Sequence, residues 1–206
     1  IWKFEYIFSI WASLSIALCL VDGLFSNVRE LPQMIYDGRL EFFMLHPINL
    51  CFHLLIARME IIKFVEGFIW MCAYAFFANT IHQFLIFLLI TLLISILMLG
   101  YLILISSLSF FLKSSQGIVD ELFNAFITFS TYPYYIFNKY IKIILFLIIP
   151  AGFISFVPIE ILYNDNNLWI GITTVVGCLI TILGLILFKT GLKYYEGSSS
   201  INQRVD

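Results

Sequence analysis

The sequence predicts an all-α polytopic membrane protein that forms a single domain over residues 1–206. Hydrophobic residues make up 62% of the chain and charged residues 12%, whereas soluble domains carry about 25% charged residues. The mean hydropathy is +1.00. Several apolar runs reach the roughly 20 residues that a helix needs to cross the hydrocarbon core. These observations exclude a soluble fold and predict five spans in this sequence.

The first predicted span covers residues 6–28 and contains one charged residue, Asp22. A carboxylate inside a membrane can belong to a proton or ion path. Asp22, however, lies near the end of the run, where water or Arg29 can reach it. Its position therefore favours a solvated carboxylate over an ion path.

Residues 29–63 form the main polar interruption of the chain, and we expect them to be cytoplasmic. Basic residues in short loops mark the cytoplasmic side of a membrane. The loop holds four of the eleven basic residues, namely Arg29, Arg39, Arg58 and Lys63. Its first part also has hydrophobic residues at helical spacing, namely Leu31, Met34, Ile35, Phe42 and Leu45. This pattern predicts an amphipathic helix that lies on the headgroups or docks on a soluble partner.

Gly38 interrupts the amphipathic pattern, so we expect two short helices rather than one. Glycine weakens a continuous helix. Asp37 is suited to be the N-cap of the second helix, and Pro47 would end that helix.

Two further spans are predicted over residues 64–80 and 84–112, with an outer polar turn between them. The second run is long enough to tilt, or to kink at Gly100. Residues 113–121, which are polar, are expected to form a cytoplasmic turn.

The next two apolar pieces, residues 122–137 and 143–162, allow two arrangements, and one piece crosses the membrane in each. In the first, residues 122–131 enter the membrane from the inside. Residues 143–162 then form a re-entrant hairpin that opens to the outside. In the second, the later piece crosses instead.

Opposite signals favour the two arrangements. Lys139 and Lys142 would be cytoplasmic in the second, which suits the positive-inside rule. Pro150 lies near the middle of the later piece and Pro158 follows, and a proline inside a helix costs about 3 kcal/mol. The prolines therefore favour the hairpin, while the charges favour the second arrangement. A last span over residues 169–188 and a cytoplasmic tail over residues 189–206 complete the chain.

No candidate for a catalytic, nucleotide-binding or metal site is found. The sequence lacks a GxxxxGK[ST] phosphate loop, an HExxH or GxSxG motif, and the basic stacking cluster of a nucleic-acid-binding protein. His46, His53 and Glu60 recur every seven residues, but such steps separate side chains by roughly 10 Å, too far for one metal ion. We expect no enzymatic activity, no cofactor in this chain and no nucleic acid partner.

Four sequence blocks resemble, in order, the signatures of a bacterial family of ABC-2-like permeases, the membrane subunits of exporters that a separate ATPase drives. Residues 36–49 resemble the pattern xxGxLxxxLLxP. Residues 132–137, 149–158 and 191–199 are similar to fPxxIf, viPxxfxxxxP and GLrrYxSxS. His46 departs from the family, which usually has a basic residue there, and Gly197 replaces a frequent serine.

The resemblance implies the transmembrane domain of an ABC type-2 exporter, acting as its permease subunit. Residues 29–63 would then be the segment that couples to the ATPase, and ATP and Mg²⁺ would be bound by that ATPase. The expected ATPase contacts are Arg39, Glu41 and Leu45. The residues expected to shape the loop are Asp37, Gly38 and Pro47. The outer re-entrant region, residues 132–163, would contain Pro133, Pro150 and Pro158.

The resemblance also implies a second permease subunit, in a homodimer or a heterodimer, and the bacterial plasma membrane as the location. Because the sequence begins with Ile1, we expect a preceding segment with a further span, giving six in the full chain. Two alternatives remain open. A secondary transporter would need inverted repeats, and none is visible. A non-transporting scaffold or immunity protein is compatible with the composition.

Overall fold

The computed structural model describes residues 3–45, 47, 49–112 and 116–202, so His46 lies outside the described residues. The described chain is all-α, as predicted, and contains no strand. The helices in chain order are α1 (Phe4–Phe25), η1 (Ser26–Glu30), α2 (Leu31–Tyr36), α3 (Leu40–Met44), α4 (Leu50–Ile56), α5 (Ile61–Phe77), α6 (Ile81–Ser107), η2 (Leu108–Phe110), α7 (Gln116–Thr131), η3 (Tyr134–Ile136), α8 (Lys139–Leu147), α9 (Ala151–Asn164) and α10 (Leu168–Asn202).

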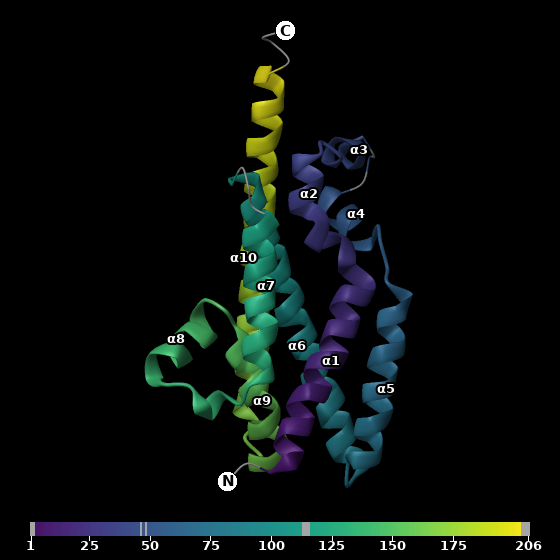
Figure 1. Cartoon of the computed structure of the whole chain (residues 1–206), viewed down its shortest axis with the longest axis vertical. Helices are drawn as coiled ribbons and strands as arrows, with labels where there is room; N and C mark the ends of the chain where they lie inside the picture. The colour runs from purple at the N-terminus through teal and green to yellow at the C-terminus, as the bar shows by residue number, and fades with distance from the viewer. Residues whose placement is uncertain (1–2, 46, 48, 113–115, 203–206) are drawn as a thin grey trace.

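The long helices run along one axis, and the short helices lie at its ends or side (Figure 1). Helices α2, α3 and α4 gather at one end, here named the coupling end, where the C-terminal end of α10 also lies. The N-terminus, the turn between α5 and α6, and the end of α9 lie at the opposite end. Two of the segments predicted to be cytoplasmic, residues 29–63 and the continuation of α10 beyond residue 188, therefore share one end of the molecule.

Among the residues that the structure describes, three helical segments are long and apolar enough to cross a membrane. They cover Phe4–Tyr36, Ile81–Phe110 and Leu168–Tyr195. The pair α8 and α9 would supply a fourth if its two bent parts form one span. Helices α5 and α7 have 17 and 16 residues, at or below the lower limit for a crossing helix. The predicted number of five spans therefore stays a prediction.

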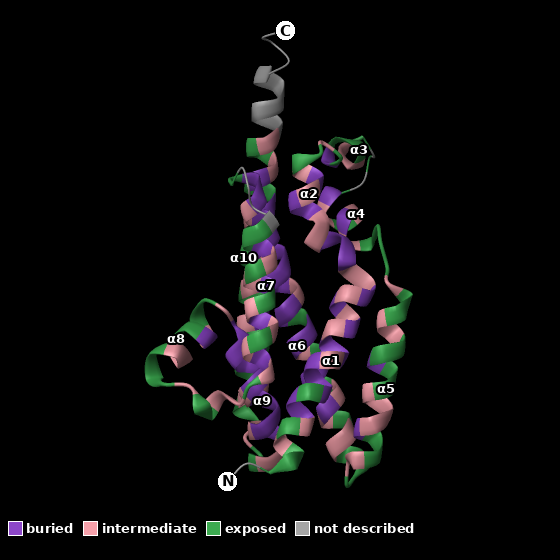
Figure 2. Ribbon diagram, viewed as in Figure 1, coloured by how far each residue is buried: buried purple, intermediate pink, exposed green. Residues whose placement is uncertain are grey.

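Helix α6 lies at the centre of the bundle and is largely buried, whereas α10 is mostly exposed along its length (Figure 2). Apolar residues of α6 join those of α1, α7 and α9 in the main hydrophobic core. Two of its buried hydroxyl groups, Thr91 Oγ1 and Ser95 Oγ, donate to carbonyl oxygens one turn earlier at 2.8 and 2.7 Å. Such bonds provide hydrogen-bond partners for hydroxyl groups that are buried in an apolar core.

Gly100 lies where the backbones of α6 and α10 come close together. A β-carbon on Gly100 would lie 2.3 Å from Thr181 Oγ1 and 2.9 Å from the Thr181 backbone nitrogen. Helix α6 continues through this residue without interruption. The glycine that was expected to permit a kink instead permits close helix packing, as small residues do in membrane bundles.

The predicted role of Asp37 is wrong, although the predicted break at Gly38 is present. Gly38 has a φ of 69°, in the left-handed region that glycine adopts readily. The turn places Asp37 at the C-terminal end of α2, and Arg39 occupies the N-cap position of α3 without a side-chain cap. The Asp37 carboxylate instead accepts a hydrogen bond of 2.8 Å from Gln33 Nε2.

Three helix boundaries also differ from the predictions. Helix α7 begins at Gln116, so much of the expected turn at residues 113–121 is helical. Pro158 lies inside α9 and does not break it, because the surrounding core holds this part of the helix. Helix α10 runs on to Asn202, so most of the expected tail continues the last helix.

Candidate functional site

Residues 29–63 divide into a part that docks on the bundle and a part that is exposed. Leu31, Met34 and Leu40 are at most 3% exposed and pack in one cluster with Phe110 and Phe188 of η2 and α10. Helix α4 adds apolar residues to the same cluster. The coupling end is therefore fixed to the membrane bundle by a small apolar core of its own.

Other large apolar residues around the turn between α2 and α3 are exposed. Tyr36, Phe42 and Leu45 are 81%, 67% and 80% exposed, respectively. The prediction that these residues share one apolar face is wrong, because the turn at Gly38 rotates α3 relative to α2. Leu40 then packs inward, while Phe42 and Leu45 point outward.

The residues predicted to contact an ATPase or to shape the loop all lie at the coupling end. Asp37 and Arg39 form an ion pair of 3.1 Å. Glu41 and Pro47 are exposed, as Leu45 is. These side chains surround the turn between α2 and α3 and leave its outer surface accessible.

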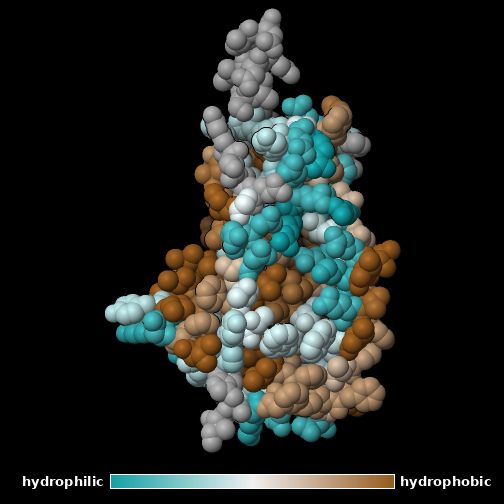
Figure 3. All heavy atoms as spheres, viewed as in Figure 1, coloured by the Kyte–Doolittle hydropathy of each residue, from teal (hydrophilic) through white to brown (hydrophobic). Residues whose placement is uncertain are grey.

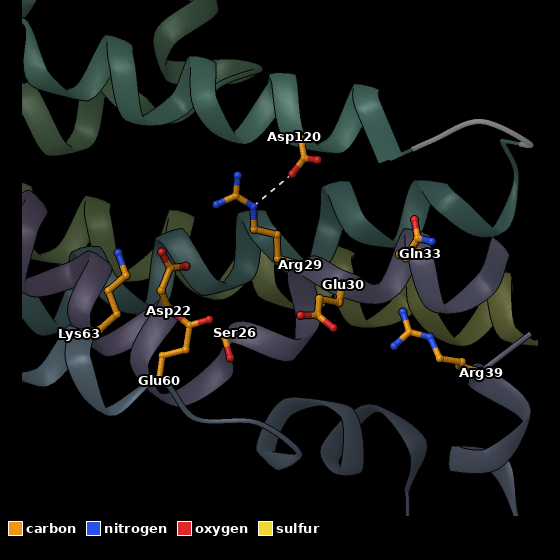
Figure 4. Close-up of a pocket in the computed structure, with 9 residues that line it drawn as sticks. All are labelled: Asp22, Ser26, Arg29, Glu30, Gln33, Arg39, Glu60, Lys63 and Asp120. Atoms are coloured by element: carbon orange, nitrogen blue, oxygen red, sulfur yellow. Dashed lines mark hydrogen bonds and ion pairs between the residues drawn. The ribbon is translucent and has the colours of Figure 1, made fainter. Parts of the chain in front are cut away.

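A polar cavity of about 570 Å³ opens between this segment and the transmembrane helices (Figure 4). It is lined by Asp22, Ser26, Arg29, Glu30, Gln33, Arg39, Glu60, Lys63 and Asp120. Acidic and basic side chains are mixed in the lining, so their charges largely compensate one another. Asp22 is half-buried and lines this cavity together with Arg29 and Lys63.

Arg29 is the residue that joins the segment to α7. Its Nε donates to Asp120 Oδ1 at 3.2 Å, and its guanidinium lies 4.9 Å from the centre of the Phe123 ring. Its Nη2 also donates to Asn124 Oδ1 at 3.5 Å. Because an ion pair, a hydrogen bond and a cation–π contact all hold one guanidinium, η1 and α7 are joined at a defined position.

A second set of polar contacts closes the loop back onto α1 and η1. Arg58 forms ion pairs with Glu30 and, at 3.9 Å, with Glu60. Asn27 Nδ2 donates to the carbonyl oxygen of Leu54 at 3.1 Å, and the backbone N–H of Glu60 donates to the Gly23 carbonyl oxygen at 2.9 Å. The C-terminal end of α4 and the entry to α5 are thereby held against α1 and η1.

The three prolines of the predicted outer region have different structural roles. Pro133 precedes η3, and Pro150 stands at the N-terminus of α9. Pro158 lies buried inside α9. Helices α8 and α9 meet at 99° around Pro150, and the chain enters and leaves this pair in the same half of the molecule (Figure 1). The bend has the geometry of a re-entrant hairpin or of a broken span.

Sequence reasoning missed Asp120 and Glu30 as members of the site. Asp120 was assigned to a turn, and its partner Arg29 lies 91 residues away. The sequence indicated Asp22, and not Asp120, as a carboxylate that Arg29 can reach. A charged residue near the start of a helix does not indicate which residue, so far away in the sequence, will be its partner.

A comparison with protein families identifies the chain. The profile described as ABC-2 family transporter protein matches residues 2–199, which confirms the resemblance seen in the four sequence blocks. No curated protein and no solved structure gives a significant match. Proteins of this family are membrane components of transporters and not themselves enzymes. Since the match covers nearly the whole of an all-α chain with several apolar spans, the chain belongs to the ABC-2 transporter family of multi-pass membrane proteins.

Proposed function

We propose that this chain is the permease subunit of an ATP-driven exporter in the bacterial plasma membrane. It works with a cytoplasmic ATPase that binds ATP and Mg²⁺, and with a second permease subunit that completes the substrate path. Membership of the family favours this function over a secondary transporter or a non-transporting scaffold.

The observation that carries the proposal is the exposed apolar surface of Tyr36, Phe42 and Leu45 at the coupling end. Leu31, Met34 and Leu40 of the same short helices are buried against the bundle, so the exposure of the other three side chains is not a general property of α2 and α3. Large apolar side chains that gather at one exposed place mark a site of protein interaction. The charged residues Asp37, Arg39 and Glu41 beside them supply the polar rim of such a contact.

The connections of this segment give a route for coupling. A rigid segment moves its attached helices when an ATPase pushes on it, and Arg29 attaches η1 to α7 through Asp120. Arg58 and Glu30 attach the far end of the loop to η1. ATP can shift the permease between two states only if those states contact the ATPase differently, and the exposed surface supplies that difference.

Leu45→Asp tests the proposal. Leu45 is 80% exposed and supports no core, so the substitution should leave the fold intact. A carboxylate in an apolar contact is strongly unfavourable, and the variant should lose the ATPase in a pull-down from detergent.

Leu45→Met should keep the ATPase, because it preserves an apolar side chain. Ile136→Asp is a matched control, since Ile136 is 58% exposed and lies in η3, away from the coupling end. Normal ATPase binding and turnover by Leu45→Asp would exclude this contact surface.

A further inference from the structure

Helix α8 projects from the side of the bundle next to an open groove of about 450 Å³ (Figure 1). The groove is lined by Tyr134, Lys139, Lys142, Ile143, Phe146 and Leu147. Two of these residues are cationic and none is acidic. The space-filling view shows hydrophilic surface at the tip of this projection and hydrophobic surface directly beside it (Figure 3).

The positive charge of the groove is not neutralised by carboxylates in the part of the chain that the structure describes. The ion pairs there involve Arg29, Arg39 and Arg58. Lys142 Nζ instead lies 4.4 Å from the centre of the Tyr134 ring, a cation–π contact that leaves the ammonium group able to bind an anion. The nearby Glu160 accepts hydrogen bonds from Tyr135 and Asn164.

The same helix presents large apolar side chains outward. Leu147 and Ile148 are 79% and 64% exposed, and Ile143 and Ile144 are 48% and 43% exposed. Leu145, by contrast, is buried and anchors α8 in the main core. Exposed aliphatic groups next to lysines are typical of helices at a membrane interface, where the chains enter hydrocarbon and the amines reach phosphate.

We propose that this groove binds the phosphate headgroup of an anionic phospholipid. Lys139 and Lys142 contact the phosphate, and Tyr134 holds the Lys142 ammonium in place. Ile143 and Leu147 contact the upper part of an acyl chain. A soluble phosphate compound would use the two lysines but would leave the aliphatic side chains in water, so the lipid fits the whole groove better. This site is independent of the proposed coupling to an ATPase.

Photocrosslinking in nanodiscs tests the site. The full chain is reconstituted in phosphatidylcholine with a trace of phosphatidylglycerol that carries a diazirine in one acyl chain. Crosslinks are mapped by mass spectrometry to residues 139–148 and, as a reference for non-specific annular lipid, to the exposed face of α10 at residues 168–186. Unlabelled phosphatidylglycerol should displace the probe from α8 far more readily than phosphatidylcholine does, with no such preference at α10.

Lys139→Gln/Lys142→Gln should weaken this competition about 25-fold, since each lysine beside anionic lipid contributes roughly fivefold. Lys139→Arg/Lys142→Arg should retain it. Lys189→Gln/Lys193→Gln removes the same charge from the other end of α10 and should leave α8 labelling unchanged. Unfolding temperatures of all variants check that the fold is kept.

Three results would overturn the proposal. One is equal phosphatidylglycerol preference at α8 and α10. Another is displacement of the probe by soluble glycerol phosphate as effective as that by the lipid, which would indicate a site for a free anion. The third is a disulfide between two copies carrying Leu147→Cys, which would show that a second chain covers the groove.

Discussion

Gly100→Ala should destabilise the bundle, because α6 and α10 touch at this residue. The added β-carbon would lie 2.3 Å from Thr181 Oγ1, 2.9 Å from its backbone nitrogen and 3.0 Å from its α-carbon. The hydroxyl group can rotate away, but the backbone cannot, so the two helices must separate. Overpacking of this kind costs about 1–3 kcal/mol, which exceeds the gain of up to about 1 kcal/mol from the helix propensity of alanine.

Gly171→Ala is the matched control, because a β-carbon at Gly171 would have no neighbour within 4 Å. That variant receives only the propensity gain and should be as stable as the parent or slightly more stable. Because both variants receive the propensity gain, we expect them to differ by the overpacking cost alone, about 1–3 kcal/mol in the free energy of unfolding. Unfolding by sodium dodecyl sulfate in mixed micelles, followed by far-ultraviolet circular dichroism, measures this difference.

Thr181→Ala provides an internal check on the cause. Combined with Gly100→Ala, it removes the contact with Oγ1 but leaves the two backbone contacts. The double variant should therefore regain only part of the lost stability. Equal stability of Gly100→Ala and Gly171→Ala would refute the close approach of α6 and α10.

Four further outcomes are expected. Arg29→Gln and Asp120→Asn should each reduce substrate-stimulated ATP hydrolysis by the assembled transporter. Each should change the free energy of unfolding by only about 0.2–1 kcal/mol, because the ion pair is partly exposed to solvent. Unchanged hydrolysis would count against coupling through this pair. Gly38→Ala should lower the free energy of unfolding by about 1–2 kcal/mol in an unfolding titration, because a residue with a side chain is strained at a φ of 69°. A β-carbon there would have no neighbour within 4 Å, so backbone strain is the whole cost. A neutral effect would contradict the left-handed turn. A cysteine at Lys139 in a cysteine-free background should react with an impermeant maleimide from outside intact cells, and reaction only in opened cells would support the arrangement with the later piece as the span. Native mass spectrometry of the purified complex should show two permease subunits, and a single copy would contradict the proposed dimer.

Much of the fold could be predicted because it depends on local properties of the chain. Long uncharged runs require helices in a membrane, since every backbone polar group must be paired internally there. The runs at residues 6–28, 84–112 and 169–188 accordingly coincide with the three long apolar segments of the structure. The breaks at Gly38 and Pro150 are equally local, because they follow from the dihedral preferences of single residues.

The sequence indicated where in the chain the candidate site lies, but not how its residues are arranged in space. The sequence located the amphipathic polar segment of residues 29–63 and its charged residues. Only the tertiary structure decided that Leu40 packs inward while Leu45 is exposed, because the rotation of α3 depends on the turn at Gly38 and on the core beneath it. The helical wheel assumed one continuous helix, and that assumption assigned Asp37 the wrong capping role.

The sequence by itself determined that the chain is helical, crosses a membrane several times and resembles the ABC-2 permeases, since composition, run length and short motifs carry that information. Tertiary structure alone decided which distant residues meet. Arg29 finds Asp120 across 91 residues, and Gly100 meets Thr181 across the α6–α10 interface. It also decided that Pro158 stays inside a helix. In each case the arrangement is stabilised by contacts between elements that are far apart in the sequence. A local sequence pattern does not indicate which of these elements will pack together.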